Sequence, residues 1–306
     1  MEIYLAHAQG FCAGVARAIE IVDKVLKKYG IPLFVFHEIV HNTFVVEGFK
    51  SQGVQFVDDI NDVPDGARII FSAHGVEPSV VARAKEKKLH FIDATCPLVE
   101  TVHRQALKLS AEGTNVVLIG HREHQEIIGT KGYVDPKLLH IVENLEDIDN
   151  LPIDTDKGVG YVTQTTLSPD DTSLLVGRLK ERFPKLIVQR SNDICYATQN
   201  RQDAVKELCK VCDIVIICGS SNSSNSNRLK ETAQKLDVES FLIDSVDDLD
   251  MQKLSKKERI GISSGASVPS SIVFKIVSVI QNYFSVKKVH SESTPEAKIV
   301  FVFPEI

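Results

Sequence analysis

Asp93-Ala94-Thr95-Cys96-Pro97-Leu98-Val99 decides the fold, because a cysteine there stands between an apolar run and a helical pattern. The same arrangement occurs around Cys12 and Cys195. Apolar residues 3–5 and 186–188 precede these two cysteines, and apolar side chains recur at helical spacing after each cysteine. The chain therefore contains three copies of a unit in which a strand leads to a cysteine that begins a helix.

A second apolar run follows each predicted helix and ends in a polar loop, at residues 33–36, 116–119 and 214–217. The loops reach His41, His124 and Asn225, which follow their cysteines by 29, 28 and 30 residues. The near-equal offsets indicate an internal repeat.

A third apolar run in each copy, at residues 69–71, 159–162 and 260–262, leads to His74, Thr165 and Ser267. Ligands of open α/β sheets bind at the carboxyl ends of the strands. Each copy is thus expected to bring one cysteine and two polar residues to that edge.

We therefore predict an α/β fold of three βα modules related by a pseudo-threefold axis, with three thiolates at the centre. The predicted divisions are residues 1–95 with Cys12, 96–194 with Cys96, 195–285 with Cys195, and a C-terminal linker and strand at 286–306, the strand at 299–303. The alternative is that three buried cysteines simply begin helices, since free cysteine is often buried.

Composition narrows the class of protein. The chain has 306 residues, 43% of them hydrophobic, and a net charge of −6. An acidic balance argues against nucleic-acid binding. Neither an export signal nor a membrane-spanning apolar run is recognisable, so a cytoplasmic location is expected. In a reducing compartment its six cysteines are expected to be ligands, catalysts or core residues rather than disulfides.

Two loops carry chemistry. Residues 121–126 hold two histidines and two carboxylates, and His124 and Glu126 could provide a proton donor and its partner. A solvated charged loop is the alternative. Residues 220–228 are rich in serine and asparagine and precede a helix expected from about Leu229, so they suit a phosphate cradle. A flexible linker has a similar composition. The helix at about residues 270–283 follows a second anion-binding turn at 265–269.

Cys209, Cys212 and Cys218 form a rival ligand set. A single C-x-x-C without a second pair or a redox fold is weak evidence for a metal or redox site. We interpret these three cysteines as structural.

The motifs together resemble the 4-hydroxy-3-methylbut-2-enyl diphosphate reductase family, the iron–sulfur enzymes of the last step of the methylerythritol phosphate pathway to isoprenoids. The resemblance covers the chain in order, through residues 10–15, 37–42, 72–76, 93–99, 163–168, 194–198, 223–229 and 265–267. It implies a cloverleaf of three α/β modules around a [4Fe–4S] cluster held by Cys12, Cys96 and Cys195, with one iron open to substrate.

The resemblance also assigns the substrate site. It implies Glu126 as proton donor and Thr165 as the hydroxyl beside the substrate alcohol, with His124 accompanying them. It implies a diphosphate pocket formed by His41, His74, His124, Ser223, Ser224, Asn225 and Ser267. The expected partners are the small diphosphate substrate and a ferredoxin or flavodoxin as electron donor, since no G-x-G-x-x-G nicotinamide or flavin fingerprint is present.

The chain departs from the family pattern at two places. Gln125 stands where relatives usually have proline, and Ala8-Gln9 replaces the usual Pro-Arg before Gly10. We expect no RNA-binding extension of the kind that some members of the family carry after the tail.

Two other classes of function remain open from the residues. His41, His74 and His124 could hold a catalytic zinc for hydrolysis, since three imidazoles and a water form a known site. The protein could also be an iron–sulfur sensor that binds a phosphorylated ligand without converting it.

Overall fold

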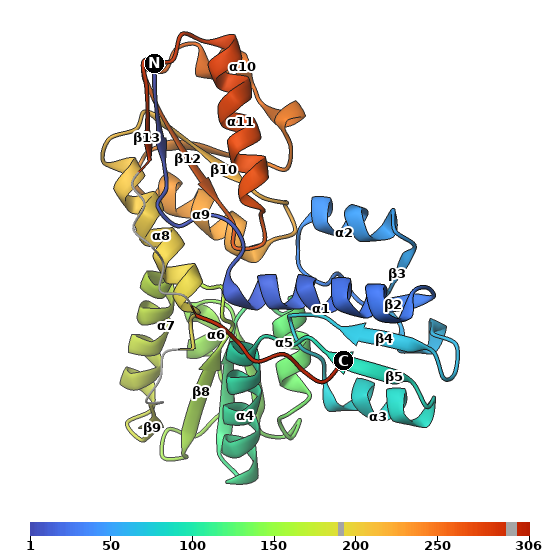
Figure 1. The fold of residues 1–306 in the computed structure, drawn as a ribbon. Helices are drawn as coiled ribbons and strands as arrows, with labels where there is room; N and C mark the ends of the chain where they lie inside the picture. The colour runs from blue at the N-terminus through green and yellow to red at the C-terminus, as the bar shows by residue number, and fades with distance from the viewer. Residues whose placement is uncertain (189–192, 292–298) are drawn as a thin grey trace. The chain divides into compact units, whose positions relative to one another are not determined.

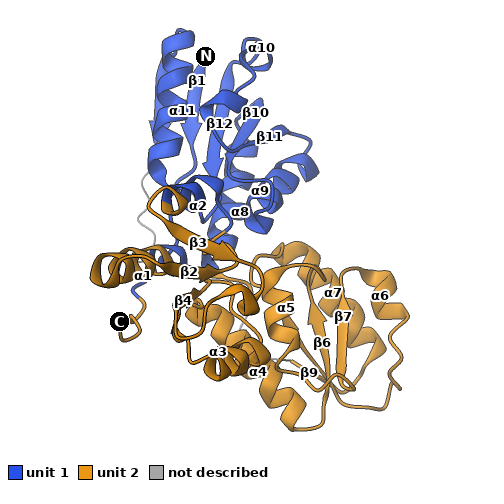
Figure 2. Ribbon diagram, turned by 90° about the vertical axis from the view of Figure 1, so that its right-hand side faces the viewer, with its two compact units in different colours: residues 1–16, 41–48, 196–300 blue, residues 17–40, 49–195, 301–306 orange. Residues whose placement is uncertain are grey.

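The computed structural model describes residues 1–188, 193–291 and 299–306, whose strands form three parallel sheets (Figure 1). The strand orders are β11-β10-β12-β1-β13, β3-β2-β4-β5 and β7-β6-β8-β9. This confirms the predicted α/β fold of three sets of βα units. The chain divides into two compact units, unit 1 with residues 1–16, 41–48 and 196–300 and unit 2 with residues 17–40, 49–195 and 301–306 (Figure 2). The pseudo-threefold relation and the predicted module boundaries stay predictions.

Unit 1 contains the five-stranded sheet. Its strands are β1 (Glu2–Leu5), β10 (Ile214–Cys218), β11 (Glu239–Ile243), β12 (Arg259–Ser264) and β13 (Lys288–Ser291). Its helices are α8 (Tyr196–Cys209), α9 (Ser224–Lys235), α10 (Met251–Leu254) and α11 (Ser270–Tyr283), with a 3₁₀ turn at Val246–Asp248.

Strand β10 is buried along its whole length because helices cover both faces of the sheet. Ile214 and Ile216 share one core with residues of α11, whereas Val215 and Ile217 share another with residues of α8 and α9. Successive side chains of a strand point to opposite faces, so a continuous apolar run serves two cores at once.

Unit 2 contains both four-stranded sheets. One is formed by β2 (Leu33–Phe36), β3 (Val54–Val57), β4 (Arg68–Phe71) and β5 (His90–Asp93), and the other by β6 (Asn115–Ile119), β7 (Leu139–Val142), β8 (Val159–Thr163) and β9 (Leu186–Ile187). Its helical segments are most of α1 (Ala13–Tyr29), the 3₁₀ turn Ile60–Asp62, α3 (Pro78–Glu86), α4 (Pro97–Ala111), α5 (Gln125–Lys131), α6 (Leu145–Asp149) and α7 (Pro169–Arg182). Helix α2 (Thr43–Lys50) begins in unit 1 and ends in unit 2.

The defining stretch shows how local sequence sets a helix start. Cys96 has an extended backbone, with φ −62° and ψ 132°, and Pro97 opens α4. A residue before proline is driven away from the helical region, and proline tolerates the first helical turn because it has no N–H to leave unpaired. The cysteine is therefore fixed at the helix N-terminus by its neighbour.

The strand expected at residues 3–5 forms, and it pairs with β12 and β13 in the sheet of β10 and β11. Two other expectations need correction. Helix α9 begins at Ser224, earlier than Leu229, because the Ser223 hydroxyl caps it.

The C-terminal strand also differs from the expectation. Residues 299–303 form no strand, and the edge strand is the more polar β13. His290 on β13 stacks on Tyr4 at 4.2 Å between ring centroids, and its Nε2 lies 2.8 Å from a carboxylate oxygen of Glu2. These polar and aromatic contacts hold the edge strand in place, and a search for apolar runs does not detect them.

Across the described ranges, no helix combines the length and the hydropathy needed to span a bilayer.

The core around Phe71 allows a stability prediction. Its side chain is fully buried and lies 5.3 Å from Phe91 and 6.3 Å from Phe36 between ring centroids. We expect Phe71→Ala to lower the free energy of unfolding by about 3–5 kcal/mol, because the cavity would remain partly unfilled. Phe274→Ala, at an exposed position on α11, should change it by less than about 0.5 kcal/mol. Urea denaturation followed by circular dichroism measures both, and equal effects would contradict the assigned core.

Candidate active site

The three cysteines have one backbone contact in common. The N–H groups of Cys12, Cys96 and Cys195 donate to the carbonyl oxygens of Ala266, Ala73 and Thr165, each at 3.0 Å. Those carbonyls belong to the loops that carry the predicted residues Ser267, His74 and Thr165. Each cysteine is thus tied to a polar loop of a neighbouring strand, and all three cysteines are half-buried.

Cys12 lies in unit 1, and Cys96 and Cys195 lie in unit 2. Among the described residues, no three His, Cys, Asp or Glu side chains form a group that could hold a metal ion. The meeting of the three sulfur atoms therefore stays a prediction, as does the three-histidine zinc alternative.

The other three cysteines lie in a different environment. Burial raises the pKa of the Cys209 thiol to about 11 and the pKa of Cys212 and Cys218 to about 12. A thiol with so high a pKa resists forming the thiolate that binds metals. This is consistent with their interpretation as structural residues.

Glu126 and Thr165 form a close pair in unit 2. Glu126 is buried near the start of α5, and one of its carboxylate oxygens accepts the Thr165 hydroxyl at 2.9 Å. Its other oxygen accepts the backbone N–H of Thr165 at 2.8 Å. The structure therefore brings together the predicted proton donor and the predicted hydroxyl, which are 39 residues apart in sequence.

His124 caps α5 and has a defined tautomer when neutral. Its Nδ1 accepts the backbone N–H of Glu126 at 3.1 Å, so the proton of the neutral ring is on Nε2. The ring of His74 meets it edge-on at 6.1 Å between centroids, and Nδ1 of His74 lies 3.4 Å from the Ser72 hydroxyl. The two imidazoles come from two segments of unit 2, His74 from the turn after β4 and His124 from the start of α5, the helix that also carries Glu126.

Unit 1 holds the remaining predicted site residues. Ser267 donates its hydroxyl to the carbonyl oxygen of His41 at 2.8 Å, which joins two of the predicted positions. Ser223 caps α9 by accepting the N–H of Ser226, and Ser224 is the first residue of that helix. The expected serine-rich cradle is therefore a helix N-terminus, which favours anions, rather than a linker.

Asn225 is the strongest sign of a polar ligand in unit 1. It is only 5% exposed, and within the described part of the chain neither its side-chain oxygen nor its nitrogen has a hydrogen-bond partner. An unsatisfied buried amide costs about 1–3 kcal/mol, which a polar ligand would relieve. A Cβ at Gly265 would lie 2.2 Å from the Ser226 hydroxyl, so glycine is needed for this turn to approach the start of α9.

Comparison with known proteins decides the family. The LytB protein family matches residues 3–281. The chain belongs to the LytB family. This confirms the family that the motifs indicated.

Several relatives of this LytB family member are named 4-hydroxy-3-methylbut-2-enyl diphosphate reductase. The Methylococcus capsulatus protein is 45% identical over 100% of this chain and 98% of its own length. The protein of Actinobacillus pleuropneumoniae serotype 3 is 48% identical with the same coverage. The solved E-1-hydroxy-2-methyl-but-2-enyl-4-diphosphate reductase of Plasmodium falciparum is 42% identical, covers 99% of this chain and 95% of its own, and superposes with a TM-score of 0.95.

His103 is a buried residue of this LytB family member that the motifs did not single out. It lies on the apolar face of α4, stacked on Tyr133 at 4.4 Å between ring centroids. A Cβ at Gly75 would lie 2.5 Å from its Cε1, and one at Gly129 would lie 3.2 Å from the Gly75 carbonyl oxygen. The imidazole therefore fills the space behind the His74 turn and α5, and only helical periodicity could have located it.

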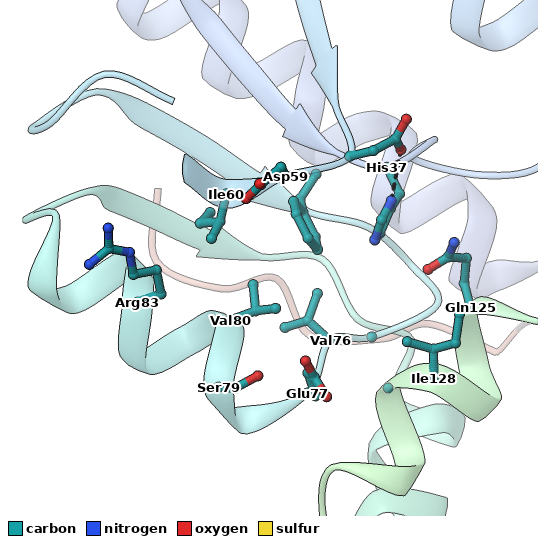
Figure 3. Close-up of a pocket in the computed structure, with 14 residues that line it drawn as sticks. His37, Asp59, Ile60, Val76, Glu77, Ser79, Val80, Arg83, Gln125 and Ile128 are labelled. Carbon is teal, nitrogen blue, oxygen red and sulfur yellow. Dashed lines mark hydrogen bonds and ion pairs between the residues drawn. The ribbon is translucent and has the colours of Figure 1, made fainter. Parts of the chain in front are cut away.

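A cavity of about 450 Å³ lies beside the same turn, since Gly75 and Val76 line it (Figure 3). Its lining includes His37, Val76, Arg83, Gln125 and Ile128, and none of the predicted site residues. Gln125 and Ile128 face this cavity, whereas the intervening carboxylate contacts Thr165. The residue that replaces the family's usual proline therefore lies next to the candidate site without entering it.

The buried His103 predicts a pH dependence. Burial lowers its pKa from 6.5 to about 4, so the folded protein keeps it neutral where the unfolded chain binds a proton. Stability should therefore fall as the pH drops from about 6.5 toward 4, by about 2 kcal/mol at pH 5. His103→Phe keeps the stack without titrating, so the difference in unfolding free energy between pH 7.5 and pH 5 should shrink by that amount. His90→Phe, at an exposed position, should leave the difference unchanged.

Proposed function

We propose that this protein is a reductase that converts 4-hydroxy-3-methylbut-2-enyl diphosphate to isopentenyl and dimethylallyl diphosphate. The observation that carries the proposal is the buried pair of Glu126 and Thr165, in a chain that matches reductases of this name over its full length. The reaction breaks one C–O bond and consumes two electrons and two protons, and the oxygen leaves as water.

We infer that Cys12, Cys96 and Cys195 hold a [4Fe–4S] cluster with one open iron. Their chemistry fits the group, because each half-buried sulfur stands at the N-terminus of a helix. The N–H of Val15 lies 3.5 Å from the Cys12 sulfur, and helix N-termini favour negative charge. When bound, the cluster would supply the electrons and a Lewis-acidic iron.

The protein's own residues bind the substrate and deliver the protons. His41, His74, His124, Ser223, Ser224, Asn225 and Ser267 would bind the diphosphate. The Nδ1 of neutral His124 accepts the Glu126 N–H, which makes Nε2 the donor nitrogen of its ring, and the Asn225 amide offers two N–H groups. Their hydrogen-bond donors would stabilise the negative charge of the diphosphate without an excess of cationic side chains.

Glu126 is suited to moving a proton. As a carboxylate it accepts the Thr165 hydroxyl, and as a carboxylic acid it could donate to the same oxygen. Reversal of that one hydrogen bond would make a proton available beside the substrate alcohol. Protonation at either end of the allylic group that remains after the C–O bond breaks would account for two diphosphate products.

The electrons would come from a one-electron protein donor, ferredoxin or flavodoxin. A cytoplasmic location stays a prediction. Anaerobic incubation with the diphosphate and each reduced donor, with product detection by mass spectrometry, tests the proposal. Binding without turnover would favour the sensor, and zinc without iron or acid-labile sulfide would favour the hydrolase.

The proton-donor role predicts the effect of Glu126→Gln. This change should leave iron content and substrate affinity intact and lower kcat by about 10²–10⁴-fold, because a positioned acid contributes on that order. Glu123→Gln, in the same loop but exposed, is the matched control and should retain full activity. Full turnover by the Glu126 variant would refute the assignment.

The ligand assignment predicts a contrast between two cysteines near the ends of α8. Cys195→Ser should lose the visible absorption and most of the iron of the anaerobically purified protein, because serine is a poor ligand for iron–sulfur clusters. Cys209→Ser should keep both, since Cys209 is assigned no ligand role. An iron count and an absorption spectrum decide, and loss in both variants would contradict the ligand set.

A further inference from the structure

Arg17 on α1 reaches the backbone that leads into Cys96. It is only 8% exposed, and its Nη1 donates to the carbonyl oxygens of Ala94 at 3.3 Å and Thr95 at 3.0 Å. Those residues immediately precede Cys96. Arg17 itself follows Cys12 by five residues, so one side chain links the helix of one cysteine to the segment of another.

Arg201 on α8 makes a second link of the same kind. It is fully buried, and its Nη2 donates to the carbonyl oxygen of Gly10 at 2.8 Å, while Nη1 donates to Ala197 in its own helix at 3.1 Å. Gly10 stands two residues before Cys12, and Arg201 follows Cys195 by six. The described residues thus contain two arginines placed alike on two cysteine helices.

Gly10 is suited to such a contact. Its φ is +79°, which favours glycine, and a Cβ there would lie 2.5 Å from the Ser270 hydroxyl. The backbone at Gly10 is therefore tightly packed, and Arg201 on α8 holds the Gly10 carbonyl oxygen. The arginine restrains the segment at the point where it turns toward the cysteine.

The C-terminal segment covers Arg17 from a further side. Nε of Arg17 donates to the carbonyl oxygen of Val302 at 2.8 Å, the Lys24 ammonium lies 3.8 Å from the centre of the Phe303 ring, and Lys28 donates to Ile306. The guanidinium is thereby fixed to two segments far apart in sequence. Its rigid planar fork can do this, whereas the point charge of lysine cannot.

The acceptors of Arg17 are all neutral carbonyls, and over the described ranges no carboxylate forms an ion pair with it. Burying a cation without a counter-charge is costly. A neutral amide could hold one carbonyl at lower cost. A buried cation beside Cys96 is better explained if negative charge gathers at the cysteines when they bind their ligand.

We propose that Arg17 and Arg201 are positioning residues that fix the backbone before Cys96 and Cys12, so that the cysteines stay placed for the cluster. The proposal rests on the proposed function for its cofactor. Neither arginine contacts the reacting atoms, and each acts through the segment that it holds.

A crossed exchange experiment on the full-length chain tests the positioning. In Arg17→Gln, amide hydrogen exchange of residues 94–98 should accelerate by about tenfold, because charge-assisted hydrogen bonds are lost, with residues 9–13 unchanged. Arg201→Gln should show the reverse pattern. Arg104→Gln, at an exposed arginine on α4 that donates to the Thr101 hydroxyl, is the matched control and should change neither segment.

Equal acceleration of both segments in each variant, or none in the segment that the arginine contacts, would overturn the proposal. Arg17→Lys and Arg201→Lys retain the charge and serve if the glutamine variants do not fold. They should show the same crossed pattern with a smaller change.

Cluster retention is measured separately, as the rate of iron loss to a chelator under anaerobic conditions. Arg17→Gln should release iron about tenfold faster than the Arg104 control. Altered exchange with unchanged iron release would refute the role toward the cluster. A wild-type chain that takes up no iron would instead refute the proposed function, and the exchange pattern would still decide whether the arginines fix these segments.

Discussion

Each cysteine owes its place to parallel strand pairing. The strands that lead to Cys12, Cys96 and Cys195 are β1, β5 and β9, and each lies beside the strand that leads to Ser267, His74 or Thr165. Neighbouring parallel strands end at the same edge of a sheet, so cysteine and polar residue leave the sheet together. The 3.0 Å backbone hydrogen bond from each cysteine then closes the junction. The sheets of both units therefore position the three cysteines through these junctions.

The buried polar side chains at these edges differ in how many of their hydrogen bonds are made within the protein. Glu126 is buried with both carboxylate oxygens occupied by Thr165, which holds the acid in one geometry. Asn225 is equally buried, yet no described residue completes its hydrogen bonds. A preorganised acid suits the delivery of a proton, and an unsatisfied buried amide suits the binding of a polar ligand. The burial of whole apolar strands offsets the free-energy cost of burying these two polar groups.

Glycine and histidine at one turn show how packing reaches the candidate site. Gly75 leaves room for the ring of His103, and His103 in turn fills the volume behind α5. The turn that carries His74 and the helix that carries Glu126 therefore rest on a common buried ring. A change in that ring would therefore disturb the positions of His74 and Glu126.

Local sequence patterns predicted the repeat, the elements around each cysteine, the family and the starts of helices, because hydrophobic period, proline and serine act over a few residues. They also singled out Glu126 and Thr165, although spacing alone could not show that the two side chains touch. The pairing of β1 with β12, the polar edge strand β13, and the contacts of Arg17 and Arg201 with the segments of other cysteines became visible in the folded chain alone. Pairing between distant strands and the destination of a long side chain depend on which surfaces meet on folding, and no local pattern records that.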